Sequence, residues 1–199
     1  MKQQSRTSLP RFILRLCVII LTIVSVRDCE FAQSASVPQD QESVQHPLLK
    51  VGDRAPDFSL LDFKGGKFNL AKFLKKNVVL LWFTNLCPGC QEKMSTVENL
   101  KRIYEKKGVE IAAVSVLGDD RKTVENTVHE KKLTLKFLYD PKGVASEKFG
   151  GTYTPGTCPA KNIYIIGRDG KLAFKDHLPG VDEEEIAKRL DLALTQVKK

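Results

Sequence analysis

The chain has 199 residues, which is enough for one domain of about 150 residues but not for two. With 42% hydrophobic and 28% charged residues its composition is that of an ordinary globular protein, which excludes a disordered, collagen-like or membrane-embedded body. Residues 1–34 carry +3 of the net charge of +8, and the rest of the chain carries +5. Its lysines occur in pairs flanked by acids, which indicates solvated helix faces and argues against nucleic-acid binding.

Residues 1–34 have the pattern of an export signal. Four basic residues precede the apolar run Leu16–Val26, which is shorter than the roughly 20 residues that a membrane-spanning helix needs. A cleaved signal is favoured, with the cut before Ala35, and an uncleaved, tilted anchor is the alternative. We therefore expect an extracytoplasmic protein, secreted or periplasmic, with a membrane tether through this segment if the signal is retained.

Residues 35–50 are rich in Gln, Ser and Pro without apolar periodicity, which is typical of a flexible linker. The domain is expected over residues 51–199. It opens with two short apolar segments, Phe58–Leu61 and Lys67–Leu70, separated by Lys64-Gly-Gly, which predict a β-hairpin.

A strand–helix–strand–helix unit follows. The continuous apolar run Val78–Phe83 predicts a buried parallel strand, and Val109–Leu117 predicts a second one. Helices are expected over Gln91–Lys107, which Gly108 closes, and over Asp119–Lys132. One side of the first helix is expected to carry its apolar residues: Met94, Val97, Leu100, Ile103 and Tyr104.

The rest of the chain predicts a shorter strand, a helical turn, a hairpin and a last helix. Their expected ranges are Leu135–Tyr139, Pro141–Phe149, Ile163–Ile166 with Leu172–Phe174, and Asp182–Val197 with Ile186, Leu190 and Leu194 facing inward. Parallel strands joined by helices and followed by a hairpin indicate an α/β fold with a mixed central sheet. The aromatic residues expected in its core are Trp82, Phe83, Phe137 and Tyr164.

The pattern Cys87-Pro-Gly-Cys90 lies between the first buried strand and its helix. Two thiols at this spacing can close a disulfide when the first lies at a helix N-terminus and the second one turn inside. Backbone N–H groups and the helix dipole favour the thiolate of the first cysteine, and Pro88 suits the first helical position because it has no N–H. We therefore expect Cys87 to be the nucleophile and Cys90 the resolving thiol.

Two other uses of such a pair are a zinc site and a structural disulfide. Zinc needs a second pair of ligands, whereas the domain has only Cys158 besides this pair, and the three histidines show no metal-ligand spacing. A structural disulfide is compatible with export, but a CxxC between a strand and a helix is the redox arrangement. The sequence thus predicts a redox pair without a metal or a cofactor.

Three segments together resemble the thioredoxin-like redoxin superfamily: Val51–Leu60, Val78–Cys90 and Gly167–Lys171. That superfamily joins the TlpA/ResA-type thiol-disulfide oxidoreductases to the alkyl hydroperoxide reductase/thiol-specific antioxidant peroxiredoxins. The opening segment is shared by both branches, whereas the CPGC favours the oxidoreductases. The resemblance implies a thioredoxin-like fold, here with an N-terminal β-hairpin extension, with helices on both sides of the mixed sheet.

The resemblance also implies a function, namely thiol-disulfide exchange with exported proteins. An upstream thiol reductant would supply the electrons. One alternative is an atypical peroxiredoxin with Cys87 as the peroxidatic thiol. Thr84 matches the threonine of that family's motif, but Leu80 replaces its proline and Lys161 its arginine, which loses the two-pronged geometry. A non-enzymatic alternative is a copper-handling module with Cys87, Cys90 and Cys158 as ligands.

Thioredoxin-like proteins place a cis-proline opposite the CxxC, where its neighbour contacts the substrate. Pro155 and Pro159 compete for this role, and Pro159 is preferred because it lies nearer the strand at Ile163. Pro159 and Cys158 are then the expected substrate-binding residues, with Cys158 facing the CPGC pair. The position that holds a buried acid in thioredoxins is Leu81, so the acceptor for the proton of Cys90 is unassigned.

Overall fold

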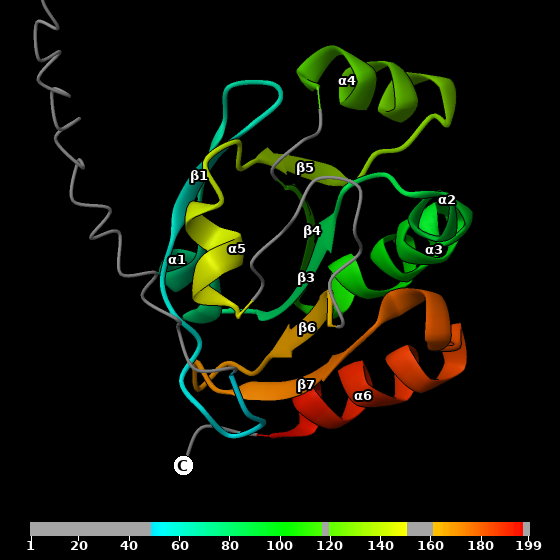
Figure 1. Cartoon of the computed structure of the whole chain (residues 1–199). Coiled ribbons are helices and arrows are strands. Elements are labelled where there is room, and N and C mark those ends of the chain that lie inside the picture. Colours follow the sequence, from blue (N-terminus) through cyan, green and yellow to red (C-terminus); the bar gives the residue numbers. More distant parts are fainter. Residues whose placement is uncertain (1–48, 117–119, 151–160, 197–199) are drawn as a thin grey trace, which may run out of the picture. The chain divides into compact units, whose positions relative to one another are not determined.

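The computed structural model describes residues 49–116, 120–150 and 161–196. Pro155, Cys158 and Pro159 lie outside these ranges. The described residues form a seven-stranded sheet in the order β2-β1-β5-β4-β3-β6-β7 (Figure 1). Its strands are β1 (Ser59–Asp62), β2 (Lys67–Asn69), β3 (Val78–Thr84), β4 (Val109–Ser115), β5 (Lys136–Tyr139), β6 (Ile163–Ile166) and β7 (Leu172–Asp176).

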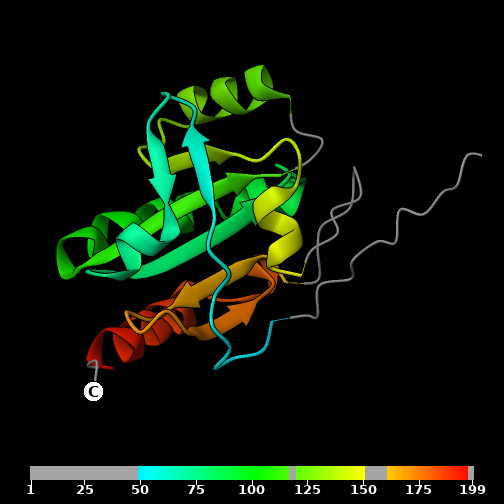
Figure 2. The same ribbon diagram turned by 90° about the vertical axis from the view of Figure 1, so that its left-hand side faces the viewer.

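The sheet is mixed, as the sequence predicted. Strands β3, β4 and β5 run parallel, while β6 runs antiparallel to β3 and β1 antiparallel to β5. The β1–β2 hairpin extends one end of the sheet, and Figure 2 shows it at the opposite end from β6 and β7. Every residue of β3 is buried, because helices cover both of its faces.

Helices pack on the two faces of the sheet. They are α1 (Leu70–Leu74), α2 (Pro88–Glu92), α3 (Met94–Tyr104), α4 (Arg121–Glu130), α5 (Val144–Lys148) and α6 (Glu183–Thr195), with the 3₁₀ turns η1 (Glu105–Lys107) and η2 (Leu178–Gly180). Val78, Leu80 and Trp82 of β3 pack in one core cluster with α3 and α6. The alternate residues Val79, Leu81 and Phe83 pack in a second cluster with residues of α1 and α5.

The helix expected over Gln91–Lys107 is divided into α2, α3 and η1, and it begins earlier, at Pro88. Gly108 ends it with φ of 86°, as predicted. The prediction for Ile103 is wrong, since this side chain is 45% exposed. Val97 and Tyr104 are seven residues apart and share a helix face, whereas Ile103 lies about 100° around the helix from Tyr104.

The four aromatic residues predicted in the core are all buried. Phe149 is the centre of an aromatic cluster, with ring centroids 5.3 Å from Phe83, 5.2 Å from Tyr164 and 5.9 Å from Phe58. The Tyr164 hydroxyl lies 3.0 Å from the Lys161 carbonyl oxygen and 3.2 Å from that of Phe149. It therefore ties the start of β6 to the end of α5.

Burial of Tyr164 predicts a loss of stability at alkaline pH. Burial raises the pKa of Tyr164 from 10.0 to about 12, so above pH 10 the unfolded chain loses this proton more readily than the folded one. The stability that the neutral phenol contributes is present below pH 10 and is lost as the pH rises toward 12, by about 2–3 kcal/mol in all. Urea unfolding from pH 9 upward should show a smaller decline in Tyr164→Phe, and equal declines would contradict this origin.

Within the described ranges, no helix is both long and apolar enough to cross a membrane.

Candidate functional site

The CPGC segment lies where β3 passes into α2. Cys87 is the N-cap of α2, with Pro88 in the first helical turn. Cys87 is half-buried, whereas Cys90 has no exposed surface. The motif therefore stands between a strand and a helix as expected, and its outer thiol is the more accessible one. The separate roles of the two thiols stay a prediction.

A strained turn positions Cys87. Leu86 has φ of 53°, a left-handed conformation that is uncommon for a residue with a side chain. Its N–H donates to Thr84 Oγ1 at 3.0 Å, and its carbonyl accepts from Gln91 Nε2 at 2.7 Å. The Cys87 N–H donates to Asn85 Oδ1 at 3.3 Å. Side chains on both sides of the turn thus hold the backbone that presents the first thiol.

A buried polar side chain contacts the Cys90 thiol. Asn162 is fully buried immediately before β6, and its Nδ2 donates to Cys90 Sγ at 3.8 Å. Sequence reasoning missed this residue, although a polar side chain at the start of the apolar run Ile163–Ile166 was a usable signal. Leu81, at the position of the thioredoxin acid, is completely buried in the core.

The turn η2 packs against the CPGC helix. A Cβ atom added to Gly89 would lie 3.5 Å from Pro179 Cγ, which is ordinary van der Waals contact. Leu178, in the same turn, is fully buried and its N–H donates to Asn162 Oδ1 at 2.7 Å. The turn η2 therefore packs on α2 and is hydrogen-bonded to Asn162, the residue that contacts Cys90.

Of the three residues compared with peroxiredoxin positions, the two polar ones have other partners. Thr84 is buried, and its hydroxyl oxygen accepts from the Leu86 N–H. Lys161 Nζ forms an ion pair with Asp176 Oδ1 at 2.6 Å, which together with the His177 N–H holds the pKa of Asp176 below its ordinary value. The ammonium at the arginine position is therefore bound to a carboxylate.

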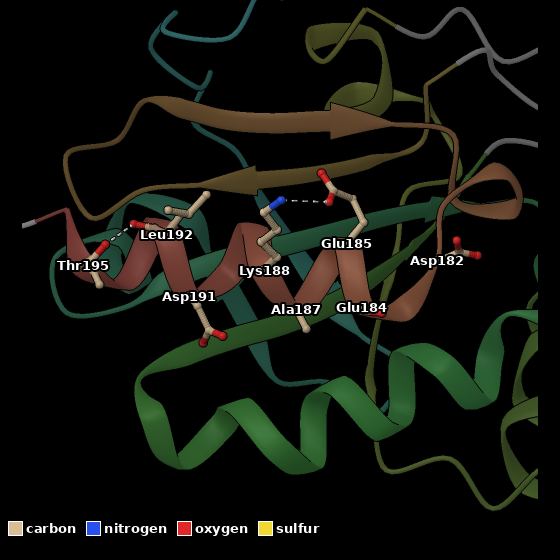
Figure 3. A pocket seen from close by; sticks show the side chains of 8 residues that line it. All are labelled: Asp182, Glu184, Glu185, Ala187, Lys188, Asp191, Leu192 and Thr195. Atoms are coloured by element: carbon tan, nitrogen blue, oxygen red, sulfur yellow. Dashed lines mark hydrogen bonds and ion pairs between the residues drawn. The ribbon is translucent and has the colours of Figure 1, made fainter.

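A surface hollow of about 700 Å³ lies along α6 (Figure 3). Its lining carries four carboxylates, from Asp182, Glu184, Glu185 and Asp191, and one ammonium, from Lys188. All its lining residues come from α6 and the residue before it, and neither cysteine of the CPGC is among them. The hollow therefore does not include the predicted CPGC site. Over the part of the chain that the structure describes, no group of three or more His, Cys, Asp or Glu side chains could hold a metal ion.

Known proteins resemble this chain in sequence and in fold. The model of the AhpC/TSA family matches residues 51–175. The thiol-disulfide oxidoreductase ResA of Geobacillus kaustophilus is 31% identical over 72% of this chain and 78% of its own length. Among solved structures, a candidate thiol:disulfide interchange protein DsbE from Chlorobium tepidum has a TM-score of 0.63 and 24% identity, covering 73% of this chain and 99% of the other.

The peroxidoxin BcpB of Mycobacterium tuberculosis is also similar in structure, with a TM-score of 0.59 and 20% identity over 76% of this chain and 99% of its own. At this identity the likeness shows the fold alone. The thioredoxin-like fold predicted from the sequence is therefore confirmed, and both the interchange protein and the peroxidoxin share it.

Proposed function

This chain belongs to the AhpC/TSA family and is a thiol-disulfide oxidoreductase, and from this premise we propose that its CPGC dithiol exchanges with disulfides of exported proteins. The observation that carries the proposal is the placement of the two thiols. Cys87 is accessible at the N-cap of α2, while Cys90 is buried one turn inside the same helix. The Cys87 thiol can therefore react with a partner protein, and the buried Cys90 thiol can react with Cys87 afterwards.

The exchange takes place in two steps. The Cys87 thiolate attacks one sulfur of a partner disulfide, whose S–S bond breaks and whose second sulfur leaves with the electron pair. Cys90 then attacks Cys87 Sγ, breaks the mixed disulfide and releases the second partner thiol. The partner has gained two electrons and the chain holds a Cys87–Cys90 disulfide, which an upstream thiol reductant opens again.

The N-terminal segment supports a location outside the cytoplasm as part of the proposal. Basic residues followed by the apolar run Leu16–Val26 are typical of an export signal. Disulfide chemistry of partner proteins is also found mainly in oxidising compartments. Retention of the segment would leave the domain tethered to the membrane through residues 35–50.

The test is insulin reduction by the full-length chain with dithiothreitol as the thiol reductant. We expect precipitation of reduced insulin well ahead of the reductant alone, because the half-buried Cys87 is accessible to a protein disulfide. Parallel assays of hydrogen peroxide consumption and of copper retained on desalting examine the two alternatives. Insulin reduction no faster than with the reductant alone, together with peroxide consumption or copper retention, would overturn the proposal.

A further inference from the structure

Both ends of the Asn162 side-chain amide are engaged. Nδ2 donates to Cys90 Sγ at 3.8 Å, and Oδ1 accepts from the Leu178 N–H at 2.7 Å. Rotating the amide by half a turn would set NH₂ against an N–H donor, so the Leu178 contact selects the orientation that points the donor at sulfur. The turn η2 therefore orients the group that faces Cys90.

The backbone of Asn162 is held equally well. Its N–H donates to the Asp176 carbonyl at 2.9 Å, and its carbonyl accepts from the Phe83 N–H at 2.8 Å. These bonds join the end of β7 to the end of β3, the strand that leads to Cys87. With no exposed surface, Asn162 is fixed relative to the strand that leads into the CPGC segment.

We propose that Asn162 is a further catalytic residue, whose amide stabilises the thiolate of Cys90. The assignment rests on the proposed disulfide exchange. A charge-assisted N–H···S⁻ bond is stronger than one to a neutral thiol, so the amide favours the form of Cys90 that reacts. An amide cannot accept the proton itself.

The step is balanced without a protein base. Cys90 loses its proton to solvent, and its thiolate attacks Cys87 Sγ to form the Cys87–Cys90 bond. The bond between Cys87 and the partner sulfur breaks, and the partner sulfur leaves with the electron pair and takes up a proton from solvent. In the reverse direction a reductant thiolate attacks Cys87, and the electron pair of the broken Cys87–Cys90 bond goes to Cys90. The negative charge then lies on Cys90 Sγ, where the Asn162 amide N–H stabilises it.

Other ionisable groups lie on the segments around Cys90, and several have partners of their own. Lys93 Nζ donates to the Val181 carbonyl, and Asp176 is paired with Lys161. Glu98 of α3 accepts from the N–H groups of Thr134 and Leu135. Other ionisable side chains on these segments include Cys87 and Glu92 of α2 and His177 beside η2.

The test uses two variants of the full-length chain. Asn162→Ala removes both the amide N–H that donates to Cys90 Sγ and the oxygen that accepts from the Leu178 N–H. Asn162→Asp keeps an oxygen acceptor for Leu178 and removes the donor to sulfur. Reduced protein is mixed with 5,5′-dithiobis(2-nitrobenzoate), quenched with acid at intervals, and the Cys87 adduct and the Cys87–Cys90 disulfide are measured by peptide mass spectrometry. The first step is adduct formation, and the second is its replacement by the disulfide.

We expect both variants to form the adduct at the wild-type rate and to resolve it about tenfold or more slowly at neutral pH. The pH at which the second step reaches half its maximal rate should move upward, because the Cys90 thiolate has lost its donor. A loss that was only structural would slow the step without moving this pH. Resolution by Asn162→Ala as fast as or faster than wild type would overturn the proposal.

Asn99→Asp is the matched control, since it makes the same change on α3, where the Asn99 side chain accepts a long 3.5 Å contact from Arg102. Both of its steps should proceed as in wild type. Thermal melts establish that each variant is folded, and Asn162→Ala carries the test if the buried carboxylate prevents folding. If wild type itself forms neither the Cys87 adduct nor the Cys87–Cys90 disulfide, the proposed exchange fails, which is distinct from failure of the Asn162 assignment alone.

Discussion

Cys87→Ser is expected to abolish disulfide exchange, with insulin reduction falling by about a thousandfold or more, because the chain loses its attacking thiolate. Cys90→Ser should instead accumulate a mixed disulfide between Cys87 and the partner. The contrast follows from exposure, since Cys87 is half-buried at the N-cap of α2 and Cys90 has no surface from which to meet a partner. Insulin turnover and non-reducing gel electrophoresis of the trapped complex measure the two outcomes.

Cys29→Ser is the matched control for these variants, since it makes the same change in the N-terminal segment, outside the expected domain. It should reduce insulin as wild type does and trap no partner. Equal trapping by Cys87→Ser and Cys90→Ser would refute the assignment of nucleophile and resolving thiol.

Phe149→Ala is expected to lower the free energy of unfolding by about 3–5 kcal/mol, and the melting temperature by roughly 10 °C. Phe149 is buried and contacts the rings of Phe58, Phe83 and Tyr164, which belong to three separate segments of the chain. Alanine would leave a cavity among rings that the surrounding strands hold in place. Urea unfolding and a thermal melt give the two values.

Phe63→Ala is the comparison for this prediction. The Phe63 ring also contacts an aromatic neighbour, with its centroid 5.5 Å from that of Tyr139, but Phe63 is only partly buried in the turn between β1 and β2. Its removal should cost clearly less, because solvent and flexible side chains can fill the space. Equal losses in the two variants would contradict the central place of Phe149 in the core.

Much of the architecture could be predicted because strand and helix periodicities are local properties. The apolar run at Val78–Phe83 predicted a buried parallel strand, and β3 pairs in parallel with β4 as expected. Ile163–Ile166 has the predicted bounds. The error at Ile103 and the division of the helix at Lys93 arose because a window of sequence does not determine how a helix is turned against its neighbours.

The candidate site divides in the same way. The spacing of Cys87 and Cys90, with Pro88 between them, depends on neighbouring residues alone, and by itself it determined the helix start and predicted a redox pair there. The left-handed Leu86 and the contact between Asn162 and Cys90 were decided only by the tertiary structure. Asn162 lies 72 residues beyond Cys90, and only the pairing of β6 with β3 brings its amide to that sulfur. The orientation of this amide depends in turn on the Leu178 N–H of η2. A hydrogen bond forms only when donor and acceptor have the right distance and angle in space, and a sequence pattern gives the position of neither group.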